Sequence, residues 1–148
     1  MSVRRATTAD LDALVRLGEL YCIADNAEWQ PDRARRGFAG LLDDDTHGVV
    51  LVTDNDGDVC GYAVLTWGWS IECGGRESLL DEMFIEHPGQ GLGSELLEAV
   101  IATAAEHGAA RVFLETEAGN ESARDFWLKR GFELEDSVWL QRLTPTTP

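Results

Sequence analysis

The sequence predicts one mixed α/β domain, an α+β fold in which a mostly antiparallel sheet of six to seven strands is flanked by about four helices. Two observations predict it. The apolar runs 48–54 and 59–71 flank the pair Asp56-Gly57, which favours a tight hairpin turn. Residues 76–86 then read as a strand that leads through a glycine-rich loop into 91–108, where apolar residues recur at helical spacing. Strand and helix patterns therefore alternate, as in helices packed on a sheet.

The same periodicities define the other elements. Thr7 or Thr8 can cap the first helix, and Pro31 suits the first turn of the second. We expect strands over 2–7, 111–117 and 132–143 (one or two strands), and helices over 7–24, 30–44 and 120–131. Residues 1–143 are predicted to be a single domain, and 144–148, "TPTTP", a disordered tail.

Composition narrows the classes of function. The formal net charge of −15 argues against nucleic-acid binding and would attract cationic small molecules, although it also fits simple solubility in a salty cytoplasm. The chain has no apolar run long enough for a membrane span, and its N-terminus lacks the apolar core of a signal peptide. The three cysteines lack metal-type spacing. We therefore expect a cytoplasmic protein without a metal, a nucleic-acid partner or a membrane partner.

The stretch "HPGQGLGSELL" places glycines at every second position before a helix. Free backbone amides and the helix dipole make such a junction an anion site, so a phosphate group is the expected ligand. The spacing does not match the dinucleotide pattern G-x-G-x-x-G, and the loop has no lysine for a P-loop. The alternative is a tight turn without a ligand.

Three landmarks resemble the GNAT superfamily of N-acetyltransferases. "GQGLGSELL" is similar to its acyl-CoA loop, "DEMFI" to its fourth strand, and "NESARDFWLKRGF" to its late motif. The resemblance covers roughly residues 3–142 and implies that acetyl-CoA is the co-substrate. It assigns acetyl-CoA contacts to Met83, Phe84, Ile85, Gly89, Gln90, Gly91, Leu92, Gly93, Ser94 and Asn120. Asn120 can also be simply a helix cap.

Two residues depart from the family pattern. Pro88 stands where the family has glutamine or arginine at the opening of the loop, and the preceding segment looks about two residues short. Trp127 stands where the family has a tyrosine that protonates the departing thiolate. An indole N–H does not give up its proton, so Tyr21, Tyr62 or water would have to serve.

Asp81 and Glu82 are the candidate catalytic residues. An alkyl ammonium has a pKa near ~10, so acetyl transfer to an amine needs a base. The two carboxylates are adjacent in a predicted strand and should point to opposite faces. The family comparison favours Asp81 as the base, acting through water, with a backbone N–H near Met83 for the oxyanion. The alternative is a structural ion pair, for instance with Arg76 or Arg111. The acidic pair also resembles that of diamine and spermidine acetyltransferases.

Glu28, Trp29 and Trp67 are the candidate acceptor-binding residues. Glu28 and Trp29 lie between the first two predicted helices, a segment that borders the acceptor site in the family. An aromatic ring beside carboxylates suits an ammonium group. The alternative is that the tryptophans are core or dimer contacts.

The sequence therefore predicts an acetyltransferase that moves an acetyl group from acetyl-CoA to a primary amine of a small, cationic molecule by direct transfer. A catalytically weak CoA-binding or regulatory module is the first alternative, and a structural domain without CoA is the second. The sequence does not fix the oligomeric state, but the resemblance implies a homodimer as a candidate assembly, with the predicted C-terminal strand that contains Trp139 as its seam.

Overall fold

The computed structural model describes residues 1–146, which form two compact units, one from Met1 to Leu114 and one from Glu115 onward. The elements, in chain order, are β1 (Ser2–Arg5), a 3₁₀ turn (Thr8–Asp10), α1 (Leu11–Ala24), α2 (Pro31–Leu42), β2 (Gly48–Asn55), β3 (Asp58–Ser70), β4 (Gly75–Ile85), α3 (Leu92–Glu106), β5 (Val112–Phe113) and α4 (Glu121–Leu128). The four helices and the mixed sheet agree with the predicted fold class.

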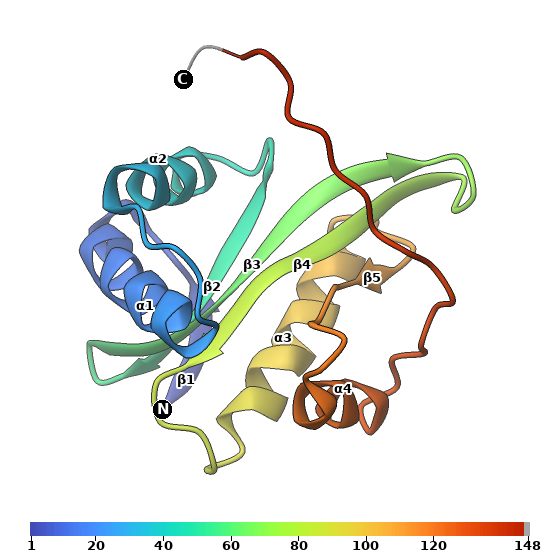
Figure 1. Cartoon of the computed structure of the whole chain (residues 1–148). Coiled ribbons are helices and arrows are strands. Elements are labelled where there is room, and N and C mark those ends of the chain that lie inside the picture. Colours follow the sequence, from blue (N-terminus) through green and yellow to red (C-terminus); the bar gives the residue numbers. More distant parts are fainter. Residues whose placement is uncertain (147–148) are drawn as a thin grey trace. The chain divides into compact units, whose positions relative to one another are not determined.

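The first unit contains one sheet with the strand order β1-β2-β3-β4-β5 (Figure 1). The first four strands pair antiparallel, and β5 joins β4 in parallel. The predicted count of six to seven strands is wrong for residues 1–146, which contain five. Residues 132–143, expected to supply the missing strands, form no strand, and β5 is shorter than the predicted 111–117.

Helices cover both faces of this sheet. α1 and α2 pack together and against β2 and β3, while α3 packs on the same strands and on β4 (Figure 1). Because the central strands are covered on both sides, successive residues of β2 from Val49 to Val52 are all buried. The core beneath α1 and α2 contains Leu14, Leu17, Phe38, Val50, Val52, Tyr62 and Val64.

A β-bulge interrupts the pairing of β3 with β4. Val64 pairs with Glu82 and the next residue, Leu65, pairs with Leu80, so Asp81 is an extra residue in β4 without a partner in β3. A bulge of this kind breaks the strict alternation of side chains between the two faces of a sheet. Its position, at the acidic pair, decides the geometry of the site.

The second unit contains α4, which begins after Asn120. The side-chain Oδ1 of Asn120 accepts a hydrogen bond of 3.1 Å from the backbone N–H of Ala123 and so caps the helix. Trp127 packs edge-to-face against Phe126 and Phe132, with ring centroids 4.9 and 5.4 Å away. The predicted disordered tail falls partly on residues 147–148, outside the described residues.

Candidate active site

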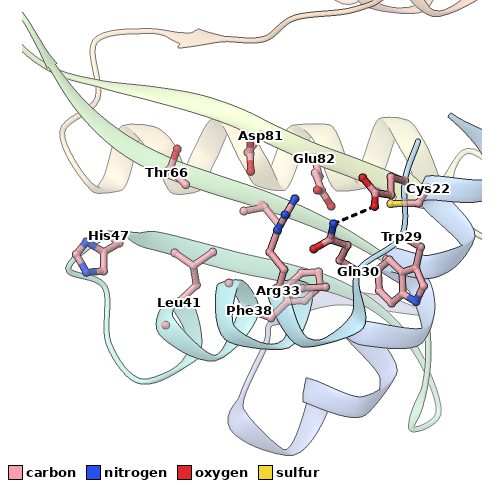
Figure 2. Close-up of a pocket in the computed structure, with 16 residues that line it drawn as sticks. Cys22, Trp29, Gln30, Arg33, Phe38, Leu41, His47, Thr66, Asp81 and Glu82 are labelled. Carbon is pink, nitrogen blue, oxygen red and sulfur yellow. Dashed lines mark hydrogen bonds between the residues drawn. The ribbon is translucent and has the colours of Figure 1, made fainter. Parts of the chain in front are cut away.

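A cavity of about 500 Å³ lies in the first unit, between helices α1 and α2 and strands β3 and β4. Its walls include Trp29 and Phe38 on the helical side and Val64, Asp81 and Glu82 on the strand side. This volume is in the range of small-molecule sites in proteins. Figure 2 shows the cavity with side chains from the helices and the strands pointing into it.

Both residues of the acidic pair line this cavity. The sequence-based expectation that Asp81 and Glu82 point to opposite faces is wrong, and the bulge is the reason. Glu82 pairs with Val64 and so lies on the α1–α2 side of the sheet, while the unpaired Asp81 turns to the same cavity. Two adjacent carboxylates therefore face one small space (Figure 2).

Glu82 is held in place by a buried tyrosine. The hydroxyl of Tyr62, which is fully buried, donates a hydrogen bond of 2.7 Å to Oε1 of Glu82. Burial raises the pKa of the Glu82 carboxyl, the Tyr62 hydrogen bond lowers it, and the charges of Asp81 and Asp25 raise it further. The net shift is upward, so the pKa of this carboxyl lies nearer to neutral pH than that of an ordinary glutamate.

Asp81 differs from Glu82 in its surroundings. Its side chain is exposed to solvent, yet the protein atoms around the carboxyl remove part of its hydration and raise its pKa. Burial also raises the pKa of nearby Tyr21 to about 12, with added effects from Asp25, Glu82 and Asp81. Tyr21 therefore keeps its proton at neutral pH, and Asp81 is the accessible titratable group of the pair.

The segment between α1 and α2 supplies two of the three predicted acceptor residues. Glu28 and Trp29 both line the cavity. The Trp29 ring covers Gly18 of α1, because a Cβ built on Gly18 would lie 3.4 Å from the ring carbon Cζ3. The amide Nε2 of Gln30 donates a hydrogen bond of 3.0 Å to Oε1 of Glu28 (Figure 2).

Trp67 lies elsewhere. It is not among the residues that line the cavity, and its indole Nε1 donates a hydrogen bond of 2.8 Å to the carbonyl of Asp45. Its ring stacks on His107, at a centroid separation of 4.8 Å, and the Arg76 guanidinium lies over it. The structure therefore gives Trp67 a set of packing partners at the end of α3, away from Glu28 and Trp29.

Arg33 is a cavity residue that the sequence analysis missed. It lies in the first turns of α2, and its side chain extends toward the strand that carries Asp81 and Glu82 (Figure 2). Among residues 1–146 it is the one lysine or arginine that lines the cavity. An arginine on the polar side of an amphipathic helix reads in sequence as an ordinary surface residue, so no signal distinguished it.

The glycine-rich loop leads directly into α3. Gly89 and Gly91 have φ angles of 109° and 77°, a backbone conformation that favours glycine. Apart from the chain neighbours, no atom of residues 1–146 lies within 4 Å of a Cβ built on either glycine. Gly91 is the N-cap of α3 and provides no side chain to cap it. The backbone amides of Leu92, Gly93 and Ser94 lie in the first turn of α3. A helix N-terminus with open space beside it can accommodate a phosphate oxygen. Gln90 is exposed, and the Leu92 side chain packs in the core.

One edge of β4 is open beside the acidic pair. β5 pairs with β4 only at Ser78 and Leu79, so no strand within residues 1–146 pairs with that edge from Leu80 onward. The N–H of Glu86 donates to Cys60 in β3, and alternation along the strand directs the N–H groups of Ile85 and Met83 to the open edge.

The side chain of Phe84 packs against the core, near Tyr62 and Tyr21. Met83, Phe84 and Ile85 are the three strand residues assigned to acetyl-CoA. The Phe84 side chain points into the core, and the backbone N–H groups of Met83 and Ile85 point to the open edge. These two features, the glycine loop and the open strand edge, fit an elongated phosphate-bearing co-substrate such as acetyl-CoA.

Within residues 1–146, no group of three histidine, cysteine, aspartate or glutamate side chains is arranged to hold a metal ion. None of the helices in that range is both long and apolar enough to cross a membrane.

Comparisons with known proteins place the chain in a family. Residues 14–132 match the Acetyltransferase (GNAT) family, and the chain belongs to that family. An uncharacterized N-acetyltransferase of Archaeoglobus fulgidus is 30% identical over 142 residues, which are 93% of this chain and 96% of the relative. An uncharacterized N-acetyltransferase of Mycobacterium bovis is 33% identical over 99 residues, and the match spans 66% of this chain and only 60% of that relative.

Two further proteins are similar to the chain over most of its length. The L-methionine sulfoximine/L-methionine sulfone acetyltransferase of Pseudomonas aeruginosa is 28% identical over 149 residues, covering 90% of this chain and 80% of that protein. The crystal structure of an integron cassette protein from the mobile metagenome of Cole Harbour Salt Marsh superposes with a TM-score of 0.82 at 28% identity, over 99% of this chain and 91% of the other.

Proposed function

We propose that the protein is an acetyl-CoA-dependent N-acetyltransferase that acetylates a primary amine of a small molecule by direct transfer. One observation carries the proposal: the bulge in β4 brings Asp81 and Glu82 together on the wall of the cavity, beside the open edge of the same strand. Membership of the GNAT family supports the same conclusion.

The acidic pair binds and deprotonates the amine. Two carboxylates attract the ammonium form of the acceptor, whose pKa is near ~10. The solvent-exposed Asp81 removes the proton through a water molecule, and Glu82, fixed by Tyr62, anchors the ammonium group. A base whose pKa is raised toward neutrality is a better match to this task than an ordinary carboxylate.

Acetyl-CoA supplies the activated acetyl group. The first-turn amides of α3 would hold its phosphates, and the N–H of Met83 would stabilise the negative charge that develops on the acetyl oxygen. The new bond joins the acceptor nitrogen to the acetyl carbon, and the bond from that carbon to sulfur breaks. The nitrogen, which has already given one proton to Asp81 through water, releases its second proton to water. A simple thiol has a pKa near ~8.5, so the departing thiolate can take a proton from water. The reaction therefore does not need a tyrosine at position 127, where this chain has a tryptophan.

The acceptor is proposed to be small and cationic at the amine that reacts. The cavity holds Glu28 in addition to the acidic pair, and Trp29 offers an aromatic face next to them. The Pseudomonas relative is named for acetylation of two small molecules, L-methionine sulfoximine and L-methionine sulfone, which supports a small-molecule acceptor.

Calorimetric titration with acetyl-CoA, followed by a thiol-release assay over a panel of primary amines, tests the proposal. Micromolar binding together with acetylation of at least one amine supports it. Binding without turnover on any amine would favour the CoA-binding module instead, which Pro88, the short loop and Trp127 motivate. If acetyl-CoA does not bind at concentrations up to millimolar, the proposed function is wrong, and the chain shares only the fold of the family.

A further inference from the structure

Arg33 is an unpaired cation in a cavity rich in carboxylates. Three acidic residues, Glu28, Asp81 and Glu82, line the same space. Nevertheless, Arg33 makes no hydrogen bond or ion pair with any residue in the described part of the chain. The guanidinium group extends into the cavity in Figure 2.

Other arginines of the first unit make short ion pairs. Arg35, two residues further along α2, binds Asp12 at 2.8 Å, and Arg16 binds Glu86 at 2.9 Å. Arg111 binds Glu77 at 2.8 Å. In a chain with a net charge of −15, a guanidinium that lines a cavity with acidic walls but pairs with none of them is available to a ligand.

The cavity therefore presents charges of both signs and an apolar wall. Asp81 and Glu82 belong to β4, whereas Arg33 belongs to α2, on the opposite side of the space. The rings of Trp29 and Phe38 line the helical side of the same cavity. A ligand with a cationic group at each end would place one of them beside Arg33, which is unfavourable. A ligand with a cationic and an anionic group would satisfy both sides.

We propose that the acceptor is an amino carboxylate, a small molecule with a primary amine, a carboxylate and an apolar side chain. This inference rests on the proposed function, since it names the substrate class of the same site. The guanidinium of Arg33 binds the carboxylate, a planar group that arginine can hold through two parallel hydrogen bonds. The ammonium group then faces Asp81 and Glu82, and the side chain lies against Trp29 and Phe38. Opposite charges on the two walls fix the orientation that brings the amine to the base.

Matched acceptors test the proposal on the full-length protein. L-phenylalanine, L-leucine and L-methionine are each compared with their amides and with the corresponding amines that lack the carboxylate, in the thiol-release assay. We expect kcat/KM to be at least ~10-fold higher for the amino acids, since a charge-assisted pair with arginine contributes to binding of the carboxylate. The variant Arg33→Gln should abolish that preference by raising the KM of the amino acids, and should leave the amides and the KM of acetyl-CoA unchanged.

Arg36→Gln is the control variant. Arg36 is exposed on the same helix, three residues from Arg33, and does not line the cavity. It should leave the kinetics of both acceptor series unchanged, so a general loss of positive charge on α2 is separated from the role of Arg33.

The outcomes separate the two proposals. Equal or better acetylation of the amides and amines would overturn the amino carboxylate while leaving acetyl transfer in place. A rise in the KM of acetyl-CoA in Arg33→Gln, with no change for the acceptors, would assign Arg33 to the co-substrate and also overturn it. Tight binding of acetyl-CoA without acetylation of any acceptor would contradict the proposed function itself, and the amino carboxylate with it.

Discussion

The hydroxyl of Tyr62 donates a hydrogen bond of 2.7 Å to Oε1 of Glu82, and it does so from a fully buried ring. The bond lowers a carboxyl pKa that burial raises. A core residue thus tunes the charge of a cavity residue. Two substitutions test the consequences of this arrangement, a third tests the glycine loop, and a fourth tests the base itself.

Tyr62→Phe should raise the pKa of Glu82 further, because the donor that favours the ionised form is lost. In the pH profile of kcat/KM, the limb on which activity rises with pH should move to higher pH. Loss of one hydrogen bond should also lower the free energy of unfolding by about 0.5–1.5 kcal/mol. Tyr21→Phe is the control, since the Tyr21 hydroxyl makes no hydrogen bond within residues 1–146. If the pH profile moves equally in both variants, the shift does not come from the hydrogen bond between Tyr62 and Glu82.

Glu82→Gln should stabilise the protein at alkaline pH. The pKa of Glu82 is raised in the folded state, so the folded protein holds this proton more tightly than the unfolded chain does. The carboxyl therefore costs stability as pH rises from about 4.3, the ordinary value, toward the raised value. Glutamine keeps an acceptor for Tyr62 but never ionises.

Urea unfolding at about pH 8 and about pH 4 measures this effect. The gain in free energy of unfolding for Glu82→Gln should be present at the higher pH and should shrink at the lower pH, where the wild-type carboxyl is protonated in the folded state and largely protonated in the unfolded chain. A gain that is the same at both pH values would show that the change acts through packing and not through the charge.

Gly91→Ala should weaken acetyl-CoA binding. Gly91 has a φ of 77° at the start of α3, and alanine there both strains the backbone and places a methyl group beside the first-turn amides. Gly57→Ala is a matched control, because Gly57 has a φ of 92° in the β2–β3 turn and equally open space around its Cβ.

Both glycine variants should lose a similar amount of stability, of order 1 kcal/mol, in thermal unfolding. Only Gly91→Ala should raise the dissociation constant of acetyl-CoA in a calorimetric titration. Equal affinities in the two variants would argue that the loop is a turn without a ligand.

Much of the fold could be predicted from periodicity. The hairpin at Asp56-Gly57, the helix that begins after Gly91 and the helix that begins at Pro31 all occur, because local patterns of apolar residues and turn residues determine them. The C-terminal strands over 132–143 could not be predicted correctly. An alternating pattern shows only that a segment can be a strand, whereas a strand also needs a partner edge, which depends on tertiary structure.

Several residues that line the cavity, Glu28, Trp29, Asp81 and Glu82, were singled out from the sequence, but their geometry was not predictable. Asp81 and Glu82 stand out as carboxylates among apolar residues, but alternation placed them on opposite faces. The bulge that brings them together depends on the register between Val64 and Leu65 in β3, a long-range property. Arg33 was missed for a related reason: its lack of a partner is visible only when the facing strand is in place.

Asp81→Asn is the most direct test of the central claim, that the acidic pair in the bulge catalyses acetyl transfer. The measurement is kcat with the preferred amine, together with calorimetric binding of acetyl-CoA, with Asp32→Asn on the exposed start of α2 as control. We expect kcat to fall at least ~10²-fold for Asp81→Asn, with acetyl-CoA affinity intact and no change in the control. Unchanged turnover in Asp81→Asn would show that this carboxylate is not the base.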